Sequence, residues 1–320
     1  MIYRKVGGSG LEVSALGLGT LTWGRDVDLK TARSLLRAFI SAGGNLIDTA
    51  PVYSEGLAER FLGKIIATDW SREDVILASK AGFVVRDGNQ LINTSRANML
   101  DQLATTLRRL GTDYLDLWQV HAWGDAPIDE TLAALDQAVS SGMVRYAGVC
   151  NFVGWQIGTA STWQAAQAGR TPLVSTQVEY SLLARRAEVE IIPASLHHGM
   201  GIFPWSPIGR GVLTGKYLGR TPNNSRGAQE SFAWFVEPYL QPRSKAIVEA
   251  TAHAADGLGL TPAQVAFLWV RDAPGVTSPL LGARTPEQLQ TYLDLDSTRL
   301  PMPIVEALDD ITGGTNLLRG

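Results

Sequence analysis

The chain has 320 residues and a single cysteine, Cys150, so it cannot form an intramolecular disulfide or a zinc site of the Cys-x-x-Cys kind. Its opening residues, MIYRKVGGSG, lack the apolar stretch of a secretory signal peptide. No apolar run approaches the roughly 18 residues that are needed to cross a bilayer. These absences predict a cytoplasmic protein with no metal site and no membrane segment.

Charge of one sign is also scarce. The chain has 28 Lys and Arg against 31 Asp and Glu, a formal net charge of −3, and no block of like charges. Nucleic acids and anionic membranes attract strongly basic surfaces, so neither is expected as a partner. Hydrophobic residues make up 45% of the chain, which is typical of a globular protein and enough for a large core.

Two kinds of segment alternate along the chain. Apolar residues with helical periodicity occupy 30–42 and 96–110, and Thr261-Pro262 is typical of a helix start before 261–271. Short apolar segments, typical of parallel strands that are covered on both faces, lie between the helical stretches. The eight candidate strands are residues 13–19, 45–49, 75–80, 114–121, 145–150, 174–179, 201–205 and 277–282.

Eight strands that alternate with helices predict an α/β protein with a single (β/α)8 TIM barrel spanning residues 1–320. A doubly wound open sheet is the alternative, but it would place G-x-G-x-x-G after the first strand, and Gly17–Thr20 does not continue that pattern. The glycines of residues 1–12 predict a β-hairpin, which we expect across the barrel floor. Residues 219–243 predict a long lid or binding loop in the C-terminal part.

The ends of the candidate strands carry polar side chains, where a barrel of this kind has its chemistry. Asp48 ends the second strand with Tyr53 close behind, Lys80 ends the third, and His121 ends the fourth. Each alone could be structural, as a helix cap, a half-buried ring, a solvated strand end or a satisfied histidine. Together they face one mouth, and lysine rarely closes an apolar strand. The set therefore predicts a site for proton chemistry.

These four side chains fit the reduction of a carbonyl group. A carbonyl that accepts a hydride becomes an alkoxide unless an acid supplies a proton. Tyr53 can be that acid, and a neighbouring Lys80 ammonium should lower its pKa, with Asp48 as the counter-charge that a buried lysine requires. His121 can donate a hydrogen bond to the carbonyl oxygen and orient it. The predicted catalytic residues are therefore Asp48, Tyr53, Lys80 and His121.

Several segments resemble the aldo-keto reductase family, especially its bacterial and potassium-channel β-subunit-like branch. GGNLIDTAPVYSEGLAERFLGK (43–64) is similar to the segment around the family's catalytic aspartate and tyrosine. ASKAG (78–82) and YLDLWQVH (114–121) resemble its lysine and histidine strands. WSPIGRGVLTGKY (205–217) resembles the segment that stacks on the nicotinamide and wraps the pyrophosphate, and LGARTPEQL (281–289) the one that holds the adenosine phosphate. The resemblance covers nearly the whole chain.

The resemblance implies a barrel enzyme that reduces small aldehydes or ketones with a nicotinamide cofactor. Asn151 and Gln177 match the positions that hold the carboxamide, and Arg284 lies where the phosphate of NADPH binds, so we expect NADPH in preference to NADH. The cofactor contacts that we expect are Gly19, Thr20, Asp48, Asn151, Gln177, Trp205, Ser206, Pro207, Gly209, Lys216, Arg226, Gly282, Arg284 and Gln288.

The chain departs from the family pattern at two cofactor positions. Cys150 stands where serine is common, which would remove a hydroxyl contact, and we expect the thiol to be a buried structural group. Trp205 stands where many members stack a tyrosine on the nicotinamide. Substrate contacts are expected from Tyr53 and His121 and from Trp23 and Trp123, which follow strand ends.

The sequence also bears on two other functions. Potassium-channel β subunits resemble aldo-keto reductases and act largely as regulatory partners, and the four catalytic side chains do not separate them from enzymes. A barrel hydrolase would require paired carboxylates or a metal constellation at the strand ends, which this sequence does not supply. The substrate, the reaction direction and the choice between monomer and homo-oligomer stay open.

Overall fold

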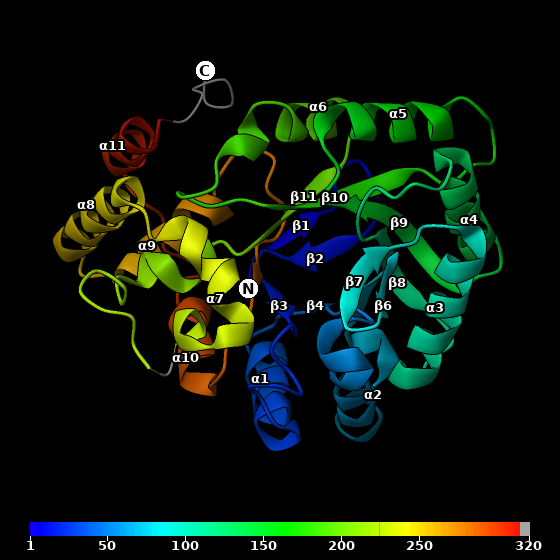
Figure 1. Ribbon diagram of the computed structural model, residues 1–320, viewed down its shortest axis with the longest axis horizontal. Coiled ribbons are helices and arrows are strands. Elements are labelled where there is room, and N and C mark those ends of the chain that lie inside the picture. The colour runs from blue at the N-terminus through cyan, green and yellow to red at the C-terminus, as the bar shows by residue number, and fades with distance from the viewer. Residues whose placement is uncertain (224, 314–320) are drawn as a thin grey trace.

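The computed structural model describes residues 1–223 and 225–313, and eight parallel strands in it close into a barrel (Figure 1). Each strand is hydrogen-bonded to the next one along the chain, and the last returns to the first. This confirms the (β/α)8 barrel and excludes the open sheet. The barrel strands are β3 (Gly17–Gly19), β4 (Leu46–Asp48), β5 (Ile76–Ala81), β8 (Leu115–Val120), β9 (Val144–Cys150), β10 (Leu173–Glu179), β11 (Gly201–Trp205) and β12 (Leu280–Leu281).

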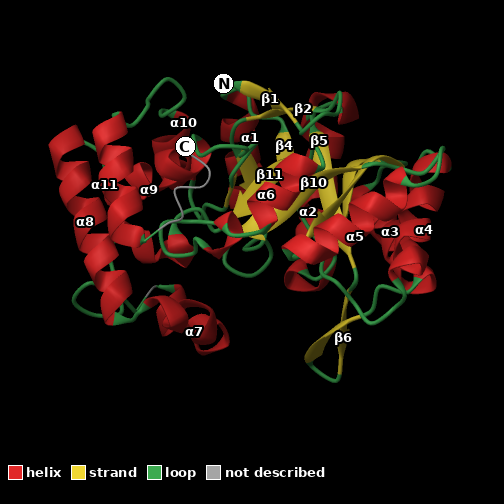
Figure 2. Ribbon diagram, turned by 90° about the horizontal axis from the view of Figure 1, so that it is seen from above, coloured by secondary structure: helices red, strands yellow, loops and turns green. Residues whose placement is uncertain are grey.

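Helices surround the barrel, and α8 and α11 pack together on one outer flank (Figure 2). The predicted periodic segments are helices, and local signals define their ends: Thr261 caps α9 in a reciprocal pair with Gln264, and left-handed Gly111 ends α3. The helices are α1 (Leu29–Ser41), α2 (Leu57–Asp69), α3 (Arg96–Leu110), α4 (Ile128–Ser140), α5 (Gly154–Ala165), α6 (Ile191–His197), α7 (Glu230–Val236), α8 (Pro242–Leu258), α9 (Pro262–Arg271), α10 (Pro286–Leu293) and α11 (Met302–Thr312). Among the described residues, no helix is long and apolar enough to cross a membrane.

The N-terminal hairpin closes one end of the barrel, as predicted. Strands β1 (Tyr3–Lys5) and β2 (Glu12–Ser14) pair antiparallel, and Figure 2 shows them at the end opposite α7 and β6. Val6 and Val13 are completely buried in the same cluster as Leu117 of the barrel interior. Burial of apolar side chains therefore attaches the hairpin to the barrel floor.

The predicted first strand, residues 13–19, is wrong in its extent. The structure divides it between hairpin strand β2 and barrel strand β3, with a short turn between them. The turn is held by the Ser14 hydroxyl, which donates to the carbonyl of Leu16 at 2.7 Å. Residues 13–19 contain no charged residue and no proline, so the sequence carries no compositional break where one strand ends and the other begins.

A second hairpin at the barrel mouth was not predicted. Strands β6 (Phe83–Arg86) and β7 (Asn89–Ile92) pair antiparallel around Asp87 and Gly88, whose φ angles are 51° and 75°. Asp-Gly favours this tight turn because both of its positions require positive φ. The hairpin projects from the same side of the barrel as α7 (Figure 2).

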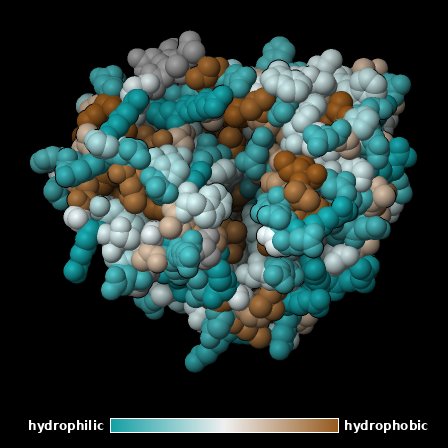
Figure 3. Space-filling view, in the orientation of Figure 1, coloured by the Kyte–Doolittle hydropathy of each residue, from teal (hydrophilic) through white to brown (hydrophobic). Residues whose placement is uncertain are grey.

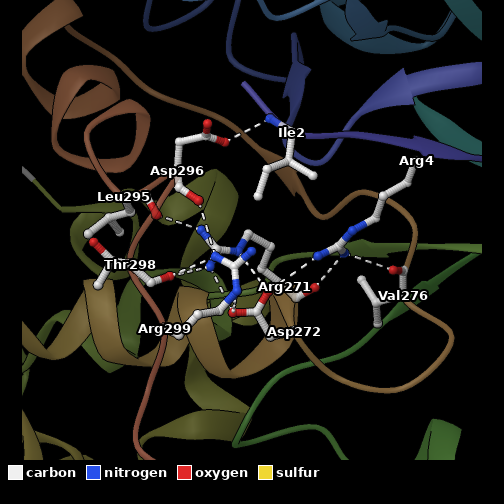
Figure 4. A network of polar contacts seen from close by, with 9 residues as sticks. All are labelled: Ile2, Arg4, Arg271, Asp272, Val276, Leu295, Asp296, Thr298 and Arg299. Carbon is white, nitrogen blue, oxygen red and sulfur yellow. Dashed lines mark hydrogen bonds and ion pairs between the residues drawn. The ribbon is translucent and has the colours of Figure 1, made fainter.

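An arginine network on the floor side joins the N-terminal hairpin to residues 271–299 (Figure 4). The buried Arg271 donates to the carbonyls of Leu295 and Thr298, at 2.7 and 2.5 Å. Arg4 of β1 donates to the carbonyl of Arg271 at 2.7 Å, and Asp296 accepts from the amide of Ile2 at 2.8 Å. These contacts connect the N-terminal hairpin to α9 and to the segment that follows α10.

Candidate active site

Three predicted catalytic side chains meet at the ends of β4 and β5. The Lys80 ammonium lies 2.6 Å from Asp48 Oδ2 and 3.2 Å from the hydroxyl of Tyr53, and it donates to the carbonyl of Thr49 at 3.1 Å. Parallel pairing of β4 with β5 places Asp48 opposite Ala78, two residues before Lys80. Lys80 is completely buried, so Asp48 is the counter-charge that keeps its ammonium in the interior.

Burial dominates the proton affinity of Tyr53. It raises the pKa of the phenol to about 12, and nearby Lys80 opposes the increase while Asp48 adds to it. The predicted lowering by Lys80 is therefore present, but it does not determine the net direction. For Lys80 itself, burial opposes the charge, yet the attraction of Asp48 and Tyr53 raises its pKa. At neutral pH the site thus holds a protonated phenol beside an ammonium, which is the proton-donating form.

His121 follows β8 and faces the same cavity. Its ring packs edge-on against Phe83, with centroids 4.4 Å apart, and lies 6.4 Å from the ring of Tyr53 at 80°. Burial, and secondarily the charge of Lys80, lowers the pKa of His121 well below its ordinary value. A neutral imidazole can donate one hydrogen bond to an oxygen atom in the cavity.

Two amide side chains stand at the ends of the next strands. Asn151 donates to the carbonyl of His121 at 3.0 Å and accepts at 3.0 Å from the indole nitrogen of Trp205. Gln177 donates to Asp48 Oδ1 at 2.9 Å. These bonds hold Trp205 and both amides in fixed orientations around the barrel axis. Amide groups of this kind can pair with the carboxamide of a nicotinamide.

Cys150 is a buried, free thiol between these amides. It is 1% exposed, its sulfur lies 3.7 Å from Gln177 Oε1, and the Asn151 amide lies 3.2 Å from the sulfur. Burial raises the pKa of the Cys150 thiol to about 12. A thiol with so little thiolate is a poor nucleophile, in agreement with the structural role that was predicted for it.

A groove leads away from the catalytic side chains. The inner cavity, of about 240 Å³, has Tyr53 and His121 at one end. It continues into a second cavity of about 380 Å³ that ends at Arg284, and both share Arg210, Arg226 and Gly282 as walls. Figure 3 shows the corresponding hollow in the middle of the mouth face, with apolar surface along its sides. An elongated ligand with a flat ring at one end and an anion at the other fits this shape.

The far end of the groove is positively charged. Lys216, Arg226 and Arg284 all line it. Burial and the charges of Arg284 and Arg226 lower the pKa of Lys216, and burial with the charge of Arg25 lowers that of Arg226. Mutual repulsion between partly buried cations makes a bound anion favourable here. The donor set therefore fits the phosphates of a dinucleotide.

The lid is more regular than the predicted loop. Residues 219–243 contain α7, flanked by the short 3₁₀ segments Arg226–Ala228 and Glu237–Tyr239. Arg210 connects this lid to the barrel: its guanidinium binds Glu179 of β10 through two 2.6 Å bonds and donates to the carbonyl of Phe235 at 2.6 Å. The ring of Phe235 lies 6.3 Å from that of Trp205 at 18°. The lid thus supplies an aromatic wall to the cavity.

Eight residues besides Cys150 line the inner cavity but were not predicted as contacts from the sequence: Leu21, Thr22, Ile208, Arg210, Gly211, Phe235, Leu280 and Leu281. A basic residue between two glycines of a proposed phosphate loop could have pointed to Arg210, whose own φ is 57°. Nothing local distinguishes Phe235 from the other lid aromatics, because its place depends on how α7 folds over the mouth.

The structure places most of the predicted cofactor residues on the groove. The inner cavity is lined by Gly19, Asp48, Asn151, Gln177, Trp205, Ser206, Pro207, Arg226 and Gly282, and the outer one by Lys216, Arg226, Gly282, Arg284 and Gln288. Thr20 and Gly209 lie behind these walls. Thr20 is buried, and its hydroxyl and amide both bind the carbonyl of Asp48 at 3.0 Å, so it supports the site.

The predicted substrate contact of Trp23 needs correction, whereas that of Trp123 stays a prediction. Trp23 is completely buried in the main core and does not line either cavity, because the loop after β3 turns its indole inward. Trp123 is half-buried and packs against Phe152 and Trp155, with centroids 5.2 and 5.1 Å apart, beside the cavity and outside its lining. Both tryptophans therefore stabilise loops near the mouth.

Comparison with known proteins agrees with this geometry. The model of the aldo/keto reductase family matches residues 15–312. A protein of Arabidopsis thaliana named as a probable voltage-gated potassium channel subunit beta is 35% identical over 314 residues, 95% of this chain and 94% of that one. The uncharacterized oxidoreductase YrpG of Bacillus subtilis is 35% identical over 324 residues (98% and 97%), and protein tas of Escherichia coli is 36% identical over 325 residues (92% of each).

Proposed function

Because this chain belongs to the aldo/keto reductase family, we propose that it is an NADPH-dependent enzyme that reduces small aldehydes or ketones to alcohols. The observation that carries the proposal is the contact of Tyr53, Lys80 and Asp48 at the inner cavity of a groove whose outer cavity is cationic. Such a groove fits a dinucleotide, and the three side chains fit the delivery of a proton.

The nicotinamide would lie among Asn151, Gln177 and Trp205, with the two amides at its carboxamide and the indole against its ring. When bound, reduced nicotinamide supplies a hydride. Trp205 and Phe235 present apolar rings to this part of the cavity, which favours the displacement of water when the cofactor binds.

The chain's own residues complete the reduction by supplying a proton. As the carbonyl carbon gains the hydride, negative charge develops on the oxygen, and the Tyr53 hydroxyl transfers its proton there. The Lys80 ammonium, 3.2 Å away, stabilises the phenolate that this transfer leaves, and Asp48 holds that ammonium in place. His121 donates a hydrogen bond to the same oxygen and so fixes the orientation of the carbonyl.

NADPH is favoured over NADH by the cations at the outer end of the groove. Arg284 precedes α10, whose cap Thr285 accepts from the amide of Gln288, and the Gln288 side chain accepts from the amide of Arg284 at 3.0 Å. An arginine at a helix N-terminus is well suited to a phosphate monoester on the adenosine ribose. Lys216 and Arg226 add charge in the same cavity.

The direct test is NADPH consumption by the purified protein with a panel of aliphatic and aromatic aldehydes and ketones. Substrate-dependent oxidation that is lost in Tyr53→Phe supports the proposal. No oxidation with any carbonyl, or activity that does not depend on Tyr53, contradicts it.

A second function is suggested by the names of two relatives, from Arabidopsis thaliana and Oryza sativa. The Arabidopsis protein, which matches this chain over 94% of its own length, is named as a probable voltage-gated potassium channel subunit beta. Co-purification with a membrane channel, together with negligible carbonyl reduction, would favour this function over the reductase.

A further inference from the structure

The chain directly after Tyr53 adopts an uncommon backbone conformation. Ser54, Glu55 and Gly56 have φ angles of 48°, 56° and 85° within the short 3₁₀ segment Tyr53–Gly56. L-residues normally visit this left-handed region one at a time, so three in succession persist only where the surroundings hold them. None of the three lines the inner cavity, so the contacts that hold them lie outside it.

One support for the turn is the side chain of Ser54. Its hydroxyl donates to the carbonyl of Trp23 at 2.7 Å. The amide of Trp23 binds the carbonyl of Thr20 at 2.9 Å, and Thr20 binds the carbonyl of Asp48. The Ser54 hydroxyl therefore connects the turn that carries Tyr53 to a loop that is bonded to the strand of Asp48.

The second support is a buried carboxylate. Glu59 of α2 is completely buried and pairs with Arg109 of α3 at 3.0 Å. The Arg109 guanidinium lies directly under Gly56, where an added Cβ would approach its carbon to 2.2 Å. Glu59 also accepts from the hydroxyl of Ser79 at 3.2 Å, and Ser79 immediately precedes Lys80 on β5. The Glu59 carboxylate therefore contacts both Ser79, which is next to Lys80, and Arg109, which lies against the turn that follows Tyr53.

We propose that Ser54 and Glu59 are positioning residues that set the 3.2 Å contact between the Tyr53 hydroxyl and the Lys80 ammonium. Ser54 positions Tyr53. Glu59 positions Tyr53 through Arg109 and Lys80 through Ser79. The inference rests on the proposed function, because only that function gives the contact a catalytic role.

The expected consequence is a change in the acidity of Tyr53. A longer distance between the ammonium and the phenol weakens the attraction that stabilises the phenolate, so the pKa of Tyr53 rises further. In alcohol oxidation Tyr53 must accept a proton, so the pH at which this rate reaches half of its maximum should move upward. A residue that only stabilised the fold would not move this profile.

The experiment measures kcat for alcohol oxidation across pH in Ser54→Ala, Glu59→Gln and wild type, with cofactor binding followed by tryptophan fluorescence. Ser34→Ala is the matched control, because its hydroxyl also binds a backbone carbonyl, that of Lys30, but on the exposed side of α1. We expect roughly tenfold lower kcat and an upward-shifted profile in both test variants, since small misplacements of reacting groups are costly. Cofactor affinity should be unchanged.

An unshifted profile in Ser54→Ala, with or without a loss of kcat, overturns the proposal. Ser54→Ala removes only one oxygen atom from a half-buried site, so this variant should fold. It therefore tests the proposal even if Glu59→Gln does not fold. Tyr53→Phe distinguishes a failure of the proposed function from a failure of the positioning role. Wild-type activity in Tyr53→Phe refutes the proposed function, whereas an inactive Tyr53→Phe with a normal Ser54→Ala refutes only the positioning role.

Discussion

The hydroxyl of Tyr53 and the ammonium of Lys80 lie 3.2 Å apart, although the residues belong to different strand–helix units and are 27 positions apart in the chain. Because the contact is buried, it affects the acidity of the phenol. The same interior that raises the pKa of the phenol to about 12 holds a charged lysine that can stabilise the phenolate. The phenol therefore keeps its proton at rest and can release it when an oxygen beside it becomes negative.

Replacing Tyr53 with Phe tests the acid directly. The substitution keeps the ring and removes the proton, so carbonyl reduction should fall by about 10²-fold or more. Cofactor binding should persist, because the hydroxyl is not at the cationic end of the groove. Steady-state kinetics with a good aldehyde, and titration of NADPH, measure the two effects separately. Reduction near the wild-type rate would refute the role of Tyr53.

Replacing Lys80 with Met should do comparable damage by another route. The variant keeps a phenol but loses the charge that stabilises its phenolate, and it leaves Asp48 as a buried carboxylate without its partner. We therefore expect lower kcat and also lower thermal stability, which distinguishes Lys80→Met from Tyr53→Phe. Thermal unfolding of both variants beside their kinetics is the measurement. Undiminished kcat in Lys80→Met would contradict the mechanism.

Arg284→Ala should weaken the discrimination between NADPH and NADH. Charge-assisted bonds to a phosphate contribute roughly 1.5–3 kcal/mol, enough for at least about tenfold discrimination. The comparison is kcat/KM for both cofactors in wild type and variant, with Arg299→Ala, on the floor-side network, as the control. If the variant keeps the wild-type preference for NADPH, or if the wild type has no such preference, Arg284 does not discriminate between the two cofactors.

The lid should become better protected when cofactor binds. Residues 219–243 reach from the cationic end of the groove to Phe235 at the cavity, and Arg210 holds the lid through a backbone carbonyl. Hydrogen exchange of this segment should slow in the presence of NADPH, because lid opening is then coupled to loss of ligand contacts. Equal exchange with and without NADPH would mean that the lid is an ordinary surface segment.

Acid stability should depend on His121. Its folded-state pKa lies well below the ordinary value of 6.5, so below that pH the unfolded chain binds a proton that the folded chain excludes. The stability associated with neutral His121 is present above 6.5 and is lost on acidification, by at most about 1.4 kcal/mol per pH unit. Wild type should therefore lose more stability than His121→Gln between about pH 7 and about pH 5.

Urea unfolding at several pH values measures this difference. His253→Gln, at an exposed position of α8, is the matched control and should follow wild type. Parallel stability curves for wild type and His121→Gln would show that the folded protein accepts the proton on His121.

Much of the barrel follows from local patterns in the sequence. Apolar segments alternate with amphipathic helices, which sets the fold class, and polar residues at strand ends identify Asp48, Lys80 and His121 because parallel strands all end at one mouth. Helix ends such as Thr261 are equally local, since a cap depends on residues three or four positions away. The register of neighbouring strands then brings Lys80 beside Asp48.

Contacts between distant segments were decided only by the tertiary structure. Trp23 and Trp123 follow strand ends as Tyr53 and His121 do, yet loop packing turns one into the core and the other onto Phe152. Phe235 reaches the cavity only because Arg210 and Glu179 anchor α7 across the mouth. Likewise, the pKa of Tyr53 depends on how completely the folded barrel buries it. Periodicity determines which elements form, but side-chain direction and desolvation depend on neighbours that the linear order does not bring together.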